Sequence, residues 1–374
     1  MAVEAGRAAL EAAAGTAGVE HVVLVTRDVP LLEGGSSAAL LAGLGLPLDT
    51  ETTERVGGAP ATLDAVLSAR PRTLVVAADL DPGGAGAVVV PASGLPLRPI
   101  GRATRSLPVQ ARSADGITHR YDDPRLLRER GLRASLDRLS QELKGKPAAI
   151  AGAPFPQVRP LCADEPPRLP VLGASATVFA LAALVERQKA GVLVATEQAS
   201  LTAAALEPGG DIRVVRNEPP GRPVPVARVT PGPDLPVSLA AYERAFEAKV
   251  GWQAAGCVRC GTLAYPPRHR CRECGSEGEW SSVPLPRRAE VYTAVTVHVP
   301  VPGLATPYSL AVVQLDGTDV RVLARTTAAE AGAVAIGDTG RMTLRRVAVR
   351  SGVPDYGYAF WPDYTLEGLE EVAE

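Results

Sequence analysis

Four cysteines are the residues of this sequence whose type and spacing most clearly predict chemistry. They lie in two Cys-x-x-Cys-Gly motifs, Cys257–Gly261 and Cys271–Gly275. Each motif directs two thiolates at one point, so together they offer the four sulfur ligands of a tetrahedral structural zinc site, Cys257, Cys260, Cys271 and Cys274. The alternatives are unconnected thiols or disulfides, and the reducing cytosol that we expect for this chain disfavours disulfides.

The composition limits the classes of protein that this chain could be. A length of 374 residues suffices for two or three domains, and a net charge of −2 gives no bulk attraction to nucleic acid or to an anionic membrane. The first 14 residues carry charges inside a helical pattern, unlike a signal peptide. The longest uncharged run, Leu169–Val185, falls short of the ~20 residues of a membrane span. We therefore expect a cytoplasmic protein that does not engage a membrane.

Residues 1–206 alternate short apolar runs with helical patterns, which is typical of an α/β layered fold. The predicted strands are Val22–Thr26, Thr73–Ala78, Ala85–Val90, Ala148–Gly152 and Gly191–Thr196. The predicted helices are 3–14, Gly57–Ala69, Pro124–Leu143 and Gly173–Arg187. The order helix, strand, buried helix, strand occurs twice, and Leu74–Ala78 corresponds to Val192–Thr196. This indicates a degenerate internal duplication whose halves bury their apolar helices between two sheets.

The remaining residues have a different character. Residues 207–236 are rich in Pro and Gly and predict a linker. A short helix and the cysteine motifs follow in residues 237–286. Residues 287–364 contain β-branched runs separated by turn residues, which predict a small barrel such as an OB-fold. The predicted strands there are Val291–Val299, Tyr308–Leu315, Val320–Thr326 and Gly340–Val349, and residues 365–374 form a C-terminal tail.

The motifs of residues 237–364 resemble a known family. Besides the four cysteines, they are Tyr265-Pro-Pro-Arg268, Val291-Tyr-Thr293, His298-Val-Pro-Val-Pro-Gly303 and Tyr356-Gly-Tyr358. The resemblance is to OB-fold proteins with an N-terminal rubredoxin-like zinc ribbon that accompany thiolases and related acyl-CoA enzymes. It implies a scaffold beside a thiolase-fold partner, and in some members a contribution to the acyl-CoA tunnel of that partner.

Residues 1–206 resemble the thiolase superfamily, in its 3-hydroxy-3-methylglutaryl-CoA synthase and ketoacyl synthase III branch. The matching segments are Met1–Leu10, Gly57-Gly58 with the following helix, Val171–Ala176 and Leu193–Glu197. That family uses a cysteine nucleophile, a histidine, and an asparagine or second histidine. The resemblance places Arg55, Gly152 and Ala174 at these three positions. It therefore implies a truncated, internally duplicated thiolase-like domain without catalytic residues.

Two other groups of residues could take part in chemistry. Cys162 could be a displaced nucleophile, but its neighbours Asp164 and Glu165 should raise its pKa, which favours an incidental thiol. Arg268 and Arg270, beside the second cysteine motif, could bind the phosphates of coenzyme A, acidic groups of a partner, or nucleic acid. They could also form a solvated loop. Nucleic acid is not expected, because the predicted strands carry few aromatic residues for base stacking.

Three hypotheses of function follow. The first is a non-catalytic scaffold subunit in a hetero-oligomer with an active thiolase-fold acyltransferase, thiolase or aldolase. It would contain structural Zn²⁺ and help to form a shared site for a coenzyme A thioester or an acyl carrier protein. The second is an enzyme in its own right, an acyl-CoA C-acyltransferase or aldolase with a non-cysteine mechanism that forms or cleaves carbon–carbon bonds. The third is a nucleic-acid-binding module built from a zinc ribbon and an OB-fold.

Overall fold

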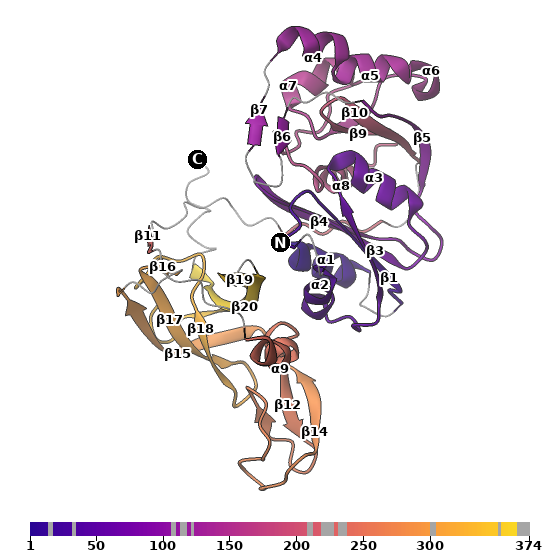
Figure 1. The fold of residues 1–374 in the computed structure, drawn as a ribbon. Helices are drawn as coiled ribbons and strands as arrows, with labels where there is room; N and C mark the ends of the chain where they lie inside the picture. Colours follow the sequence, from indigo (N-terminus) through magenta and orange to yellow (C-terminus); the bar gives the residue numbers. More distant parts are fainter. Residues whose placement is uncertain are drawn as a thin grey trace. The chain divides into compact units, whose positions relative to one another are not determined.

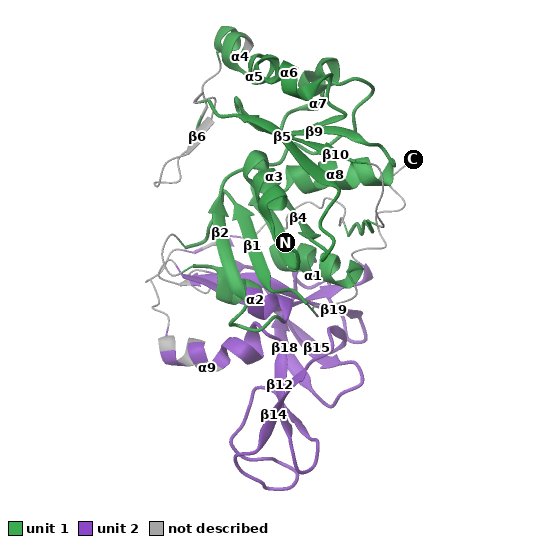
Figure 2. Cartoon of the chain, turned by 90° about the vertical axis from the view of Figure 1, so that its right-hand side faces the viewer, with its two compact units in different colours: residues 1–40, 46–217 green, residues 41–45, 218–374 purple. Residues whose placement is uncertain are grey.

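The computed structural model describes residues 1–13, 18–31, 35–105, 110–112, 118–120, 123–207, 212–217, 228–230, 238–299, 304–350 and 353–364. The chain divides into two compact units, residues 1–40 with 46–217 and residues 41–45 with 218–374 (Figure 2). The predicted tail 365–374 and most of the predicted linker 207–236 lie outside the described residues. None of the helices in the described part of the chain is long and apolar enough to cross a bilayer.

The first unit contains two four-stranded sheets (Figure 1). The first has the order β2 (Glu51–Val56), β1 (His21–Thr26), β3 (Thr73–Leu80) and β4 (Gly83–Val89). The second has the order β5 (Leu97–Ala103), β10 (Ser200–Leu206), β9 (Gly191–Glu197) and β8 (Ala149–Ala151). Strands β3 and β9 each pair in parallel with an earlier strand and antiparallel with the next one. The predicted internal duplication is therefore present in the strand pairing.

Two buried helices lie between these sheets, as the sequence predicted. Helix α3 (Ala59–Ser68) contacts β1 and β3 of the first sheet and β9 and β10 of the second. Helix α8 (Ala176–Glu186) contacts α3, β4, β8 and β9. Helix α8 lies very close to β4 of the first sheet. A Cβ added at Gly86 of β4 would lie only 2.7 Å from the Val178 side chain of α8. Leu63 and Leu184, one from each helix, are completely buried in this layer.

The helices on the other sides of the sheets are shorter. Helix α1 (Ala2–Ala12) packs on β3 and β4, while α5 (Leu132–Arg138) packs on β10 and α6 (Ser140–Leu143) on β5. The single helix predicted over Pro124–Leu143 is wrong, because α4 (Pro124–Arg130) ends at Gly131, whose ψ of −159° is extended. A Cβ at Gly131 would lie 2.2 Å from the Leu127 carbonyl oxygen, so this break requires glycine. The other elements are α2 (Ser37–Leu44), α7 (Phe155–Val158), the 3₁₀ helix Arg159–Leu161, β6 (Gln110–Arg112) and β7 (Thr118–Arg120).

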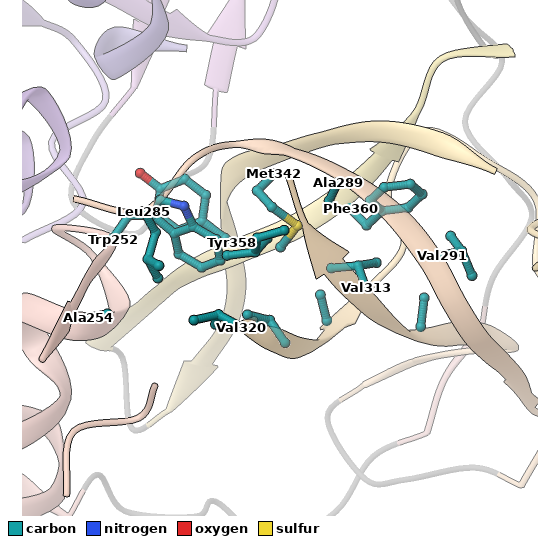
Figure 3. Packing of buried hydrophobic residues seen from close by; sticks show 14 of the residues in the cluster. Trp252, Ala254, Leu285, Ala289, Val291, Val313, Val320, Met342, Tyr358 and Phe360 are labelled. Atoms are coloured by element: carbon teal, nitrogen blue, oxygen red, sulfur yellow. The ribbon is translucent and has the colours of Figure 1, made fainter. Parts of the chain in front are cut away.

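The second unit contains the predicted OB-fold barrel. Its strands have the order β18 (Arg321–Arg325), β17 (Tyr308–Leu315), β15 (Arg288–Val297), β19 (Thr339–Arg350) and β20 (Val353–Pro362). A bridge between Thr326 and Phe360 joins the two ends of this sheet. Phe360 and Met342 fill the core, and the Trp252 ring lies 4.3 Å from that of Tyr358 (Figure 3). The alternation of buried and half-buried residues along β17 follows from a sheet with one face in this core.

Smaller elements complete the second unit. Strand β12 (Gln253–Cys257) lies between β13 (Leu263–Ala264) and β14 (Trp280–Pro284) and carries the first cysteine at its end. The predicted helix that precedes it is α9 (Leu239–Lys249). Within the predicted linker, β11 (Arg228–Val229) pairs with β16 (Ala305–Thr306), so this part of residues 207–236 belongs to a sheet of the second unit.

Candidate functional site

The four predicted cysteine ligands converge in the structure. Their Sγ atoms all lie within 4.8 Å of one another. The Sγ atoms of Cys257 and Cys274 are 3.6 Å apart, and those of Cys260 and Cys271 are 3.5 Å apart. A tetrahedral ion with bonds of about 2.3 Å to sulfur separates its ligands by about 3.8 Å, so this donor set fits such an ion. The cluster can therefore hold a metal.

The two cysteine motifs have the same backbone hydrogen bonds. In each, the glycine N–H donates to the carbonyl oxygen of the first cysteine, at 2.8 Å in the first motif and 3.1 Å in the second. The N–H of that cysteine donates in turn to the carbonyl oxygen of the residue after the glycine, at 3.0 Å and 2.9 Å. Gly261 and Gly275 have φ of +75° and +70°, which favours glycine. This turn is what the Cys-x-x-Cys-Gly pattern encodes.

A serine hydroxyl favours the thiolate form that a metal requires. Ser276 Oγ lies 3.2 Å from the Sγ atoms of both Cys257 and Cys274. Its hydrogen bond is the largest cause of the lowering of the pKa of Cys257 to about 6, and it also lowers the pKa of Cys274. Thiolates are the species that bind metal, so Ser276 prepares the cluster for a cation.

Arg268 and Arg270 line one cavity of about 410 Å³ in the second unit. The cavity also contains Arg272 and Arg321, and Asp319 is the one carboxylate among its described lining residues. Arg270 Nε donates to the Gly275 carbonyl oxygen at 3.2 Å, which ties this side chain to the second cysteine motif. The excess of guanidinium groups makes the cavity suitable for an anion.

The three positions assigned to catalysis by resemblance lie on separate elements. Arg55 is on β2, opposite Val25 of β1. Gly152 follows β8 with φ of +86°, and a Cβ there would lie 2.1 Å from the Thr196 carbonyl oxygen. Ala174 precedes α8 and is completely buried. Gly152 therefore has no room for a side chain.

Sequence reasoning missed a polar cluster beside these positions. The buried carboxylate of Asp79, on β3, accepts hydrogen bonds from the N–H groups of Ala174 and Ser175 at 2.8 and 2.9 Å. The carboxylate of Glu197, on β9, accepts from the Gly58 N–H at 3.0 Å. Arg27 lies 3.7 Å from Asp79 and 3.4 Å from Glu197. Two carboxylates thus occupy the N-terminal ends of α8 and α3, where exposed N–H groups favour negative charge.

The duplication contains a signal for this cluster. Aligning Leu74–Ala78 with Val192–Thr196 places Asp79 opposite Glu197, and each carboxylate caps the helix of the other half. Two threonines also form reciprocal hydrogen bonds between the halves. Thr62 Oγ1 of α3 donates to the Ala174 carbonyl at 2.8 Å, and Thr177 Oγ1 of α8 donates to the Ala59 carbonyl at 2.7 Å.

Cys162 is buried among apolar side chains at 4% exposure. Burial raises the pKa of its thiol to about 11, against a small opposite effect of Lys189 and Lys146. The direction agrees with the sequence prediction, but the cause differs. Asp164 and Glu165 are instead paired with Lys189 and Arg159 at 2.9 and 3.2 Å. A thiol with this pKa is a weak nucleophile near neutral pH.

A known protein family matches part of the second unit. Residues 282–345 match the family described as "ChsH2, C-terminal OB-fold domain". A "DUF35 domain-containing scaffold protein" of Methanocaldococcus jannaschii is 30% identical over 110 residues, 28% of this chain and 77% of that protein. The "Benzoylsuccinyl-CoA thiolase subunit BbsA" of Thauera aromatica is 32% identical over 105 residues, 28% of this chain and 71% of the relative.

A similarity of structure extends over a larger share of the chain. The crystal structure of 3-oxoacyl-[acyl-carrier-protein] synthase III from Aquifex aeolicus can be aligned with this chain. The alignment covers 55% of this chain and 82% of the synthase chain. The identity is 16% and the TM-score is 0.44.

Proposed function

We propose, because this chain belongs to the family of DUF35 domain-containing scaffold proteins, that it is a non-catalytic accessory subunit of a thiolase-fold enzyme. The OB-fold and the cysteine cluster beside it are the parts that support a scaffold role. A relative that is named as a thiolase subunit supports a hetero-oligomer. The active thiolase, acyltransferase or aldolase would be a separate chain.

The metal of the cysteine cluster is proposed to be Zn²⁺. Cys257, Cys260, Cys271 and Cys274 would hold it, and four sulfurs leave no open position for substrate. Zinc would therefore stabilise the fold of the ribbon rather than supply a Lewis acid. The Ser276 hydroxyl, which lowers the pKa of Cys257, supports loading near neutral pH.

The first unit is proposed to be a thiolase-like domain that has lost its chemistry. The observation that carries this proposal is the hydrogen bond between Glu197 and the Gly58 N–H at the start of α3. An acyl-transfer enzyme aims such N–H groups at the developing oxyanion. Here a carboxylate of the protein already accepts that hydrogen bond, and the family positions Arg55, Gly152 and Ala174 offer neither a thiol nor an imidazole.

The arginine cavity is proposed as the contribution of this chain to a shared site for a coenzyme A thioester. Arg268 and Arg270 would bind phosphate groups there, and the partner would bind the acyl end. The proposed divisions are the thiolase-like domain 1–206, linker 207–236, helix and zinc ribbon 237–286, OB-fold 287–364 and tail 365–374.

Purification of the tagged chain from its native host, followed by mass spectrometry, tests the scaffold proposal. We expect a thiolase-fold protein at a constant ratio to the tagged chain, and acyl-CoA turnover only when both chains are present. The C257S/C260S variant serves as a control, because loss of the ribbon should release the partner. Turnover of acetyl-CoA or acetoacetyl-CoA by the purified chain alone, or an acyl-thioester on Cys162, would contradict the proposal.

A further inference from the structure

The outward side of three barrel strands carries apolar side chains that are exposed or half-buried. Strand register places Thr293, Val312 and Leu323 in one row across β15, β17 and β18, and Val295, Leu310 and Arg325 in the next. The residues Tyr292, Val295 and Leu323 are 53%, 58% and 66% exposed. We call this surface the outer apolar face; its apolar members are Tyr292, Val295, Leu310, Val312 and Leu323. Leu310 and Val312 are half-buried between them, and apolar side chains that gather on a surface in this way commonly mark a binding surface.

Two arginines give the outer apolar face a positive charge. The Arg321 guanidinium lies 3.7 Å from the centre of the Tyr292 ring, and that of Arg325 lies 4.5 Å from the centre of the Tyr308 ring. Arg321 donates to the Gln314 side chain and Arg325 to the Ala305 carbonyl oxygen. Neither arginine forms an ion pair with a carboxylate of the described residues. The face is therefore suited to a segment that combines apolar and acidic side chains.

The C-terminal segment of the chain has this composition. Residues 365–374 read Thr-Leu-Glu-Gly-Leu-Glu-Glu-Val-Ala-Glu, with four glutamates and no basic residue. Leu366, Leu369 and Val372 supply apolar side chains between the glutamates. Its charge and its apolar side chains complement the outer apolar face.

The segment begins close enough to reach that face. Asp363, directly after β20, accepts hydrogen bonds from both terminal nitrogens of Arg288 at 2.9 and 2.8 Å. Arg288 and Glu290 are exposed on β15 while Ala289 between them is buried, so Arg288 lies on the outward side. Leu323 is about five residues along the strands and two strands across, roughly 20 Å away. Ten extended residues reach about 33 Å.

We propose that residues 365–374 bind the outer apolar face of their own OB-fold. The apolar side chains of the segment cover Tyr292, Val295 and Leu323, and its glutamates pair with Arg321 and Arg325. The segment shields this face from other proteins, and a partner that docks there has to displace it. This inference rests on the OB-fold of the second unit alone and does not depend on the proposed scaffold function.

Photo-crosslinking in the full-length chain tests this contact. The photoreactive residue p-benzoylphenylalanine replaces Leu323, and the matched control replaces Ile336, which is 73% exposed in the loop before β19. Mass spectrometry of an equal mixture of ¹⁵N-labelled and unlabelled protein separates crosslinks within a chain from those between chains. We expect crosslinks from position 323 to residues 365–374 of the same chain, and few from position 336.

Charge variants make the test specific. R321E/R325E should lower the crosslink yield about five-fold, as expected for the loss of roughly 1 kcal/mol of ion pairing. E367K/E370K/E371K/E374K in that background should restore it, and salt between about 50 and 500 mM should weaken the wild-type crosslink. These substitutions lie on exposed or terminal residues, and unchanged thermal melting verifies folding. Crosslinks between chains, crosslinks to residues 1–217, or none to the segment would overturn the proposal.

Discussion

The cysteine cluster and the Arg27–Asp79–Glu197 cluster both gather ionisable groups, but only the second includes a cationic side chain among its members. In the cysteine cluster, four sulfurs lie within 4.8 Å of one another, so deprotonation of all four would require a cation to offset the repulsion of the thiolates. In the other cluster, Arg27 lies between Asp79 and Glu197, and helix N–H groups donate to both carboxylates. The two clusters differ in that Arg27 lies between the acids of the second, whereas four converging sulfurs form a donor set for a metal.

The second cluster also shows how the two halves of the first unit hold one another. Asp79 belongs to the first half and caps α8 of the second, while Glu197 belongs to the second half and caps α3 of the first. Each carboxylate therefore ties the N-terminal end of one half's helix to a strand of the other half. The contrast between the clusters can be tested by removing one member of each.

Removing a cysteine ligand should have the largest effect. C271S should abolish the binding of about one Zn²⁺ per chain, and with it a binding free energy of ~10–16 kcal/mol that stabilises the ribbon. Elemental analysis and proteolysis of residues 250–286 measure the loss. C162A is the matched control, because its thiol is buried in the first unit and should leave the zinc content unchanged. Undiminished zinc in C271S would refute the four-cysteine site.

Asp79→Ala should give the next largest effect. It leaves the N–H groups of Ala174 and Ser175 without their acceptor and removes one partner of Arg27, in a site where the Asp79 side chain is fully buried. Breaking a buried pair in this way costs about 3–5 kcal/mol of unfolding free energy. Urea denaturation of the first unit measures it. Asp164→Ala, with 71% of its side chain exposed, should stay within about 0.5 kcal/mol.

The two clusters also differ in how well the sequence predicts them. The cysteine site follows from local spacing, since each Cys-x-x-Cys-Gly turn forms within five residues. The hydrogen bonds of Asp79 and Glu197 join residues that are 95 and 139 positions apart, so only the fold brings them together. The alignment of the two halves offered the available signal, because it places an acid at the end of both β3 and β9.

Some strands were likewise predictable from their own residues, whereas others depend on the strands with which they pair. Apolar runs predicted β1, β3, β4, β8 and β9. Strand β2, with the sequence Glu-Thr-Thr-Glu-Arg-Val, and the alanine-rich β10 lack that pattern, and their pairing with β1 and β9 decides their conformation. The predicted helix Pro124–Leu143 had the right apolar spacing, but Gly131 interrupts it.

Glu197→Ala should have a smaller effect than Asp79→Ala. The Glu197 side chain is 32% exposed, so in the variant water can replace part of the hydrogen bonding that the Gly58 N–H and Arg27 lose. Loss of such a helix cap costs about 1–2 kcal/mol. Urea denaturation again gives the value. The double variant D79A/E197A should cost less than the sum of the single variants, because both carboxylates share Arg27. Strict additivity would show that Arg27 does not couple them.

The smallest effects should come from the threonine pair, and they test the symmetry of the halves most directly. Thr62→Val and Thr177→Val each remove one hydroxyl that donates to a carbonyl of the opposite helix, at 2.8 and 2.7 Å, from a side chain that is completely buried. Valine keeps the shape, so each variant should lose only about 1 kcal/mol of unfolding free energy. Thr202→Val is the matched control, because its hydroxyl bonds Asp64 at 3.2 Å and joins β10 to α3 rather than one helix to the other. Equal losses at positions 62 and 177 would mean that the two halves stabilise each other reciprocally. A loss confined to one position would mean that one helix alone depends on the exchange.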